Sequence, residues 1–332
     1  MRAVAAVSLA SLGFLLACGG RSLDVEIERH PANVLPQGAT QVFYARVDRL
    51  RDNPLAVLAC ERAQKLDLGT FKSTSQTLAL AGDVERLVLG TYGATVEKEA
   101  AAVVVATGRF NEDVFRKALE TFRMPHVEGS YGDRRFYTCG RGETRCYVSF
   151  VSPRLLAVAS QEDLLKRTLA LSKRGTKSMA RDRGFAPLLQ SFSPEMDLWA
   201  TGLFPPVLSA AFGGQLQAAV QLIQAFTLKL AGQERKHLDL VLHCGSVEAA
   251  QANAMVLKTL LGATVQQLVD GGYNVADLID AVNRSQIIVE GGTADFKLEM
   301  NKAEIAATAA VLRAEPVAPA IEAFPPAAAP ER

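Results

Sequence analysis

The sequence predicts an α+β fold in which helices cover one face of antiparallel sheets, arranged as two similar halves. Three observations carry this prediction. A unit of strand, short polar turn and helix recurs along the chain, further strand-like runs lie between the units, and several adjacent runs are joined by turns too short for a crossover helix. The halves divide near residue 192 and suggest the duplication of one ancestral unit.

The recurring unit occurs at five places: 41–65, 100–122, 155–171, 237–261 and 295–312. Its turns carry residues that favour helix starts, namely Asp52 before Pro54, Asn111, Ser160 and Ser246. Further strands are expected between the units, at 84–91, 133–139, 145–151, 197–203, 225–231 and 285–291. A Gly291-Gly292 turn after the last of these runs is typical of a hairpin, so we expect antiparallel pairing.

Composition and charge limit the classes of function. The chain has 332 residues and 49% apolar content, enough for a sizeable core. Its 36 Lys and Arg residues nearly balance 35 Asp and Glu residues, so it offers no field that would attract a nucleic acid. The basic run from Lys166 to Arg183 is the local exception. It is typical of a solvated helix end and loop, and a contact with anionic lipid is the alternative.

The amino terminus has the pattern of an export signal over residues 1–17. Arg2 precedes the apolar run from Ala3 to Ala17, which is shorter than the roughly 20 residues of a permanent membrane helix. The run ends in Leu15, Leu16, Ala17 and Cys18, which resemble the lipobox of bacterial lipoproteins.

This resemblance implies cleavage before Cys18 and attachment of acyl chains, such as palmitate, to that cysteine. The protein would then be held in the cell envelope by its lipid, and Gly19, where retained lipoproteins carry aspartate, implies the outer membrane in an organism that has one. An ordinary cleaved signal with a chance cysteine is the alternative. We expect residues 18–38 to form a tether, 39–192 and 193–313 to form the two halves, and 314–332 to form a disordered Pro/Ala-rich tail.

The cysteines predict a disulfide. With Cys18 lipidated, four cysteines are left to pair in an oxidising compartment: Cys60, Cys139, Cys146 and Cys244. Cys139 and Cys146 flank a glycine-containing turn between two strand-like runs, so a hairpin would place them opposite each other. Half of a zinc site is the alternative, but a second pair with ligand spacing is missing. Cys60 and Cys244 form a weaker candidate pair, since both also suit buried positions as small apolar side chains.

No motif predicts a catalytic, metal or cofactor site. The best cluster is "HLDLVLH" at 237–243, where strand alternation places His237, Asp239 and His243 on one face and three leucines on the other. The two histidines would lie about 20 Å apart along the strand, too far to share one ion. We therefore interpret this cluster as a polar, solvent-facing surface.

The stretch Leu198–Leu228 contains no charged residue. Prolines and glycines exclude a membrane span, and Leu216, Val220 and Ile223 lie on one side of an expected amphipathic helix. This helix would cover a sheet, or line an apolar ligand groove, or dock a partner. We accordingly expect a membrane-anchored envelope lipoprotein with a non-catalytic role in binding or scaffolding an envelope protein. The alternatives are a binder of an apolar ligand such as a lipid and, third, an envelope hydrolase.

Overall fold

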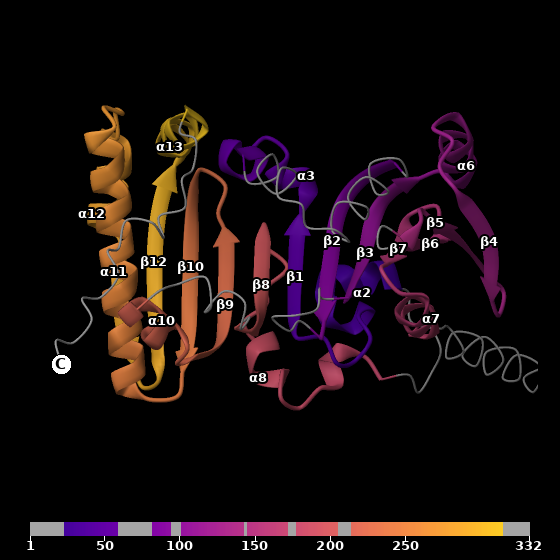
Figure 1. The fold of residues 1–332 in the computed structure, drawn as a ribbon, viewed down its shortest axis with the longest axis horizontal. Helices are drawn as coiled ribbons and strands as arrows, with labels where there is room; N and C mark the ends of the chain where they lie inside the picture. Colours follow the sequence, from indigo (N-terminus) through magenta and orange to yellow (C-terminus); the bar gives the residue numbers. More distant parts are fainter. Residues whose placement is uncertain are drawn as a thin grey trace, which may run out of the picture.

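A computed structural model describes residues 23–58, 82–93, 101–142, 145–171, 177–204 and 214–314. These residues form one antiparallel sheet of twelve strands (Figure 1), in the order β11-β12-β10-β9-β8-β1-β2-β3-β7-β6-β5-β4. Every neighbouring pair in this order is antiparallel. The predicted α+β class with antiparallel pairing is therefore confirmed.

The strands of the first half are β1 (Gln41–Arg46), β2 (Gly82–Tyr92), β3 (Ala101–Phe110), β4 (His126–Tyr131), β5 (Arg134–Cys139), β6 (Cys146–Ser152) and β7 (Leu155–Ala159). Those of the second half are β8 (Leu198–Leu203), β9 (Ile223–Ala231), β10 (Arg235–Cys244), β11 (Gln286–Glu290) and β12 (Thr293–Asn301). In each half the third strand pairs with the last strand: β3 pairs with β7 in the first half, and β10 pairs with β12 in the second. In both halves the chain passes through at least one helix between these two strands. This repeated order agrees with two similar halves, which meet where β1 pairs with β8.

The longer helices are α6 (Glu112–Thr121), α7 (Glu162–Ala170), α11 (Val247–Asp270), α12 (Ala276–Arg284) and α13 (Lys302–Ala314). Shorter helical segments are α2 (Leu23–Arg29), η1 (Pro31–Val34), α3 (Val47–Leu50), η3 (Met179–Arg181), α8 (Ala186–Leu189) and α10 (Gly214–Val220), and another helix begins at 54–58. Asn111 and Ser246 begin α6 and α11 as predicted, each accepting hydrogen bonds from the first turn. Asn53 and Gln161 stand at the other two starts, one residue beyond those expected.

We call the face of the sheet that carries Leu228 and Leu240 the front face, and the face that carries Tyr44 and Trp199 the back face. Residues that pair directly across neighbouring strands point to the same face, which assigns the faces from one strand to the next. In the second half, α11, α12 and α13 lie on the front face, against Leu242, Ala294 and Met300.

The first half differs from the expectation of helices on one face. There, α6 packs on the front face beside Ala106 and Leu156, whereas α7 packs on the back face beside Val105 and Ala157. The reason is that β3 and β7 are apolar on both sides, so both sides must be covered.

The prediction of a tether at residues 18–38 is wrong from residue 23 onward. Residues 23–38 are part of the folded body, because Leu23 and Ile27 of α2 and Val34 and Leu35 around η1 are buried in the back-face core. Gln37 donates its backbone N–H to the carbonyl of Lys177, which fastens this segment to the loop before η3. The predicted signal at 1–17, Cys18 and the tail beyond Ala314 lie outside the described residues.

Candidate apolar binding site

The front face carries apolar side chains across the six central strands of the sheet. We call these side chains the apolar floor: Leu238, Leu240 and Leu242 of β10; Phe226, Leu228 and Leu230 of β9; Leu198 and Ala200 of β8; Phe43 and Ala45 of β1; Leu87 and Leu89 of β2; Ala102, Val104 and Ala106 of β3. Along the strands, Lys236 precedes Leu238 on this face of β10, and polar Gln41 and Thr91 stand near the opposite end of β1 and β2. The floor thus joins strands from both halves into one apolar surface.

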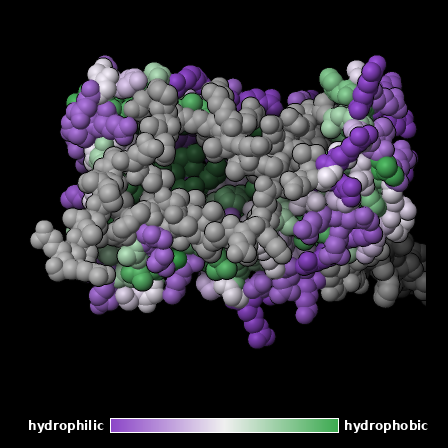
Figure 2. Space-filling model, viewed as in Figure 1, coloured by the Kyte–Doolittle hydropathy of each residue, from purple (hydrophilic) through white to green (hydrophobic). Residues whose placement is uncertain are grey.

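Helices cover the two ends of this floor. At one end Leu242 is buried beneath α11, together with Ala250, and at the other Ala106 is buried beneath α6 with Phe115. Between these ends Leu198, Leu228 and Leu230 are only half-buried. Figure 2 shows a hollow with a hydrophobic floor over this middle part of the sheet.

The uncharged run found in the sequence contributes the middle of the floor, because its two ends are strands β8 and β9. The residues predicted to contact a ligand, in contrast, are not part of the floor as the structure describes them. Val220 and Ile223 are buried, 4% and 8% exposed, in the cluster that packs α10 against α11, so they belong to the core rather than to the floor. The side chain of Leu216 lies outside the described residues. Helical spacing indicated a helix here, but α10 ends at Val220 and Ile223 begins strand β9. The open apolar surface comes from the strands on either side of α10.

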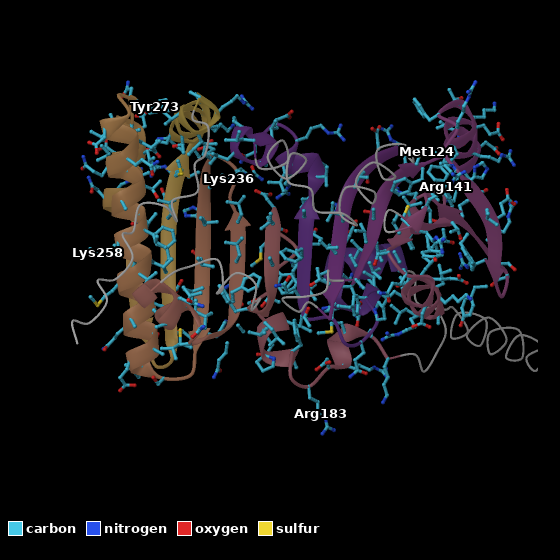
Figure 3. The ribbon with its side chains drawn as sticks, in the orientation of Figure 1. Met124, Arg141, Arg183, Lys236, Lys258 and Tyr273 are labelled. Atoms are coloured by element: carbon cyan, nitrogen blue, oxygen red, sulfur yellow. The ribbon has the colours of Figure 1, made fainter. Side chains whose placement is uncertain are left out.

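A buried carboxylate lies where the strands of the floor begin or end, beside the β9–β10 turn. Asp197, immediately before β8, is fully buried and accepts a hydrogen bond from the ammonium of Lys236. The guanidinium of Arg49 lies 3.4 Å from the other Asp197 oxygen, and Lys236 also donates to the carbonyl of Gly232, at 2.6 Å. Figure 3 labels Lys236 near the end of β10. Two cations and one carboxylate therefore hold together the ends of β1 and β8 and the β9–β10 turn.

The back face of β10 carries mostly polar side chains, as the alternation in "HLDLVLH" predicted. His237, Asp239 and His243 share this face, and His237 lies 3.4 Å from Glu299. Thr227 is within hydrogen-bonding distance of His243, 3.3 Å from its Nε2. In the part of the chain that the structure describes, no group of three or more His, Cys, Asp or Glu side chains could hold a metal ion.

The position of His243 predicts a pH dependence of stability. Burial, and secondly the charge of Lys229, lower the pKa of His243 from its usual value. The unfolded chain therefore takes up this proton first, so the stabilisation present above about pH 6.5 is lost as the pH falls below it. Urea unfolding between about pH 7.5 and 5 should show this loss, and His243→Gln should flatten the profile. His237→Gln, at an exposed site, is the control; an unchanged profile in His243→Gln would contradict the prediction.

The predicted cysteine pair lies in register. Cys139 of β5 pairs directly with Cys146 of β6, both are buried, and a hydrogen bond between the thiols raises the pKa of Cys139. The structure holds them as neighbouring thiols, and the disulfide stays a prediction. Cys244 is buried 3.7 Å from the amide of Asn253, while its candidate partner Cys60 lies outside the described residues.

Similarity to known proteins is found among solved structures. No family model and no curated protein matches this sequence. Among solved structures, crystal forms I and III of TP0453 align with TM-scores of 0.47 and 0.46 at 12% identity, over 85% of this chain and 97% of that chain. Crystal form IV of TP0453 aligns with a TM-score of 0.43 at 11% identity, over 84% of this chain and 96% of that one. A likeness at this level gives no information about a ligand or an activity.

Among the described residues, none of the helices combines the length and the apolar content needed to cross a bilayer.

Proposed function

We propose that this protein is an envelope lipoprotein that binds an apolar ligand, such as a lipid acyl chain, on the apolar floor without catalysing its conversion. The observation that supports this proposal most strongly is the half-buried middle of the floor, at Leu198, Leu228 and Leu230, between two helix-covered ends. Apolar surface left in water costs about 25 cal/mol per Å². An acyl chain that removes the accessible part of this surface from water is therefore bound favourably, and a contiguous apolar patch that stays partly exposed is typical of binding sites.

The proposed anchor would keep the folded body close to a membrane, which is a source of such ligands. Cys18 lies five residues before Leu23, and Leu23 is buried in the folded body. A chain extends by at most about 3.5 Å per residue, so the lipidated cysteine would hold the body within roughly 17 Å of the membrane surface.

A charge placed on the floor tests the proposal. The full chain carrying Cys18→Ser is used, so that the acyl chains of the anchor cannot compete, and binding of a fluorescent fatty acid is titrated. Leu228→Arg should weaken this binding roughly tenfold or more, because the loss of contact with two or three methylenes already amounts to that factor.

Val241→Arg is the matched control, because Val241 is a half-buried residue of the neighbouring strand β10 and faces the polar back side. It should bind the fatty acid as the parent does. Circular dichroism and urea unfolding check that both variants fold. Equal affinity in Leu228→Arg and the parent would contradict an apolar ligand on the floor and would leave the scaffolding of a protein partner as the better explanation.

A further inference from the structure

A second cavity lies on the back face, on the other side of the sheet from the apolar floor. Its volume is about 660 Å³, within the range of roughly 300–1,000 Å³ that is typical of small-molecule sites. Its walls come from α2, η1, η3, α8 and the start of β8. The cavity therefore shares no lining residue with the floor.

The inner wall of this cavity is aromatic and held in place. Trp199 of β8 packs edge-on against Phe192, with ring centroids 5.4 Å apart, and Phe192 packs in turn against Tyr44 at 5.1 Å. The indole N–H of Trp199 donates to the hydroxyl of Ser191, at 3.0 Å. These contacts fix the rings. Trp199 and Tyr44 are fully buried, so Phe192 is the ring of this set that can touch a bound apolar group.

The mouth carries positive charge and hydrogen-bond donors. Arg29 and His30 line it, and within the described parts of the chain neither side chain has a hydrogen-bond or ion-pair partner. The acids nearest in sequence are engaged elsewhere: Glu26 accepts from Asn33 at 2.5 Å, and Glu28 pairs with Arg86 at 2.9 Å. None of the described lining residues is acidic.

We propose that this cavity is a binding site for a small amphipathic anion. Its apolar part would contact Phe192, which packs against the fully buried Trp199, and its carboxylate or phosphate would accept hydrogen bonds from Arg29 and His30. Charge complementarity supports this assignment, since a guanidinium favours carboxylate and phosphate and an imidazole offers an N–H in either charge state. The site is independent of the apolar floor, so either proposal can fail alone.

Trp199 makes the test specific, because it is the one tryptophan in the sequence. A bromine atom quenches indole fluorescence on close approach, so the full chain is titrated with a brominated fatty acid and, separately, with a brominated alkyl phosphate. Saturable quenching is expected with at least one of them, and which probe quenches tells a carboxylate ligand from a phosphate ligand. The brominated alcohol of the same chain length should bind more weakly.

Variants then locate the bound probe. Arg29→Gln should weaken binding of the anionic probe about two- to fivefold, as expected for an exposed charge pair, and should leave binding of the alcohol unchanged. Ala186→Phe, which fills the cavity from α8, should abolish saturable quenching. Arg183→Gln is the matched control, since Arg183 is also an exposed arginine but extends away from the body (Figure 3).

Leu228→Arg separates this site from the floor, and quenching should persist in that variant. Absence of saturable quenching in the parent protein would overturn the proposal. Quenching that survives Ala186→Phe, or that disappears in Leu228→Arg, would also overturn it, because the probe would then be bound outside the cavity.

Discussion

Asp197→Ala should lower the free energy of unfolding by about 3 kcal/mol, measured by urea denaturation. Asp197 is fully buried and compensates Lys236 and Arg49, so its removal leaves two cations without their carboxylate. Breaking a buried ion pair costs about 3–5 kcal/mol, and we expect the lower end because the two cations keep 16% and 31% of their side-chain surface exposed.

Asp48→Ala is the matched control for this prediction. Asp48 pairs with Arg46 at 2.9 Å but keeps 37% of its side-chain surface exposed, so its loss should cost less than about 1 kcal/mol. A difference of less than about 1 kcal/mol between the two variants would show that the Asp197 cluster does not stabilise the junction of the two halves.

Joining Cys139 to Cys146 should add roughly 2.5 kcal/mol of stability, the chain-entropy value for an 8-residue loop. The two residues face each other across β5 and β6, and an oxidising envelope would favour the bond. The hydrogen bond with Cys146 and burial raise the pKa of Cys139, so little reactive thiolate exists in the folded protein. We therefore expect the bond to form during folding, before the hairpin is buried.

Non-reducing mass mapping of protein isolated from the envelope checks this prediction. A peptide pair joined through Cys139 and Cys146 is the expected result, and unfolding in the presence of a reductant should then occur at a lower urea concentration. Alkylation of both thiols in the unreduced protein after denaturation would contradict it. Cys244→Ser is the control, and it should leave the joined peptide pair in place.

Local patterns in the sequence were sufficient to predict much of the sheet. The Gly291-Gly292 turn marks the β11–β12 hairpin, and the alternation of "HLDLVLH" gives the two faces of β10. The predicted strands at 84–91 and 285–291 lie within one or two residues of β2 and β11. These features depend on neighbours in the chain, which is why one sequence can show them.

Features that depend on distant contacts were missed. The pairing of β1 with β8 joins residues more than 150 positions apart, and no local signal specifies it. The burial of α2 was also missed, although the four-residue spacing of Leu23 and Ile27 was a signal that could have indicated it. The floor was seen only in part, because the uncharged run supplies β8 and β9 while Phe43 and Leu89 come from the other half.

Photo-crosslinking with a diazirine-labelled fatty acid, followed by peptide mapping of the full chain, tests the central claim most directly. Binding on the apolar floor predicts adducts concentrated on peptides that contain Phe43 of β1, Leu198 of β8 and Leu228 of β9. These adducts should diminish when unlabelled fatty acid is added and should be lost in Leu228→Arg. Adducts confined to other peptides, or adducts on these strands that unlabelled fatty acid does not displace, would contradict the claim.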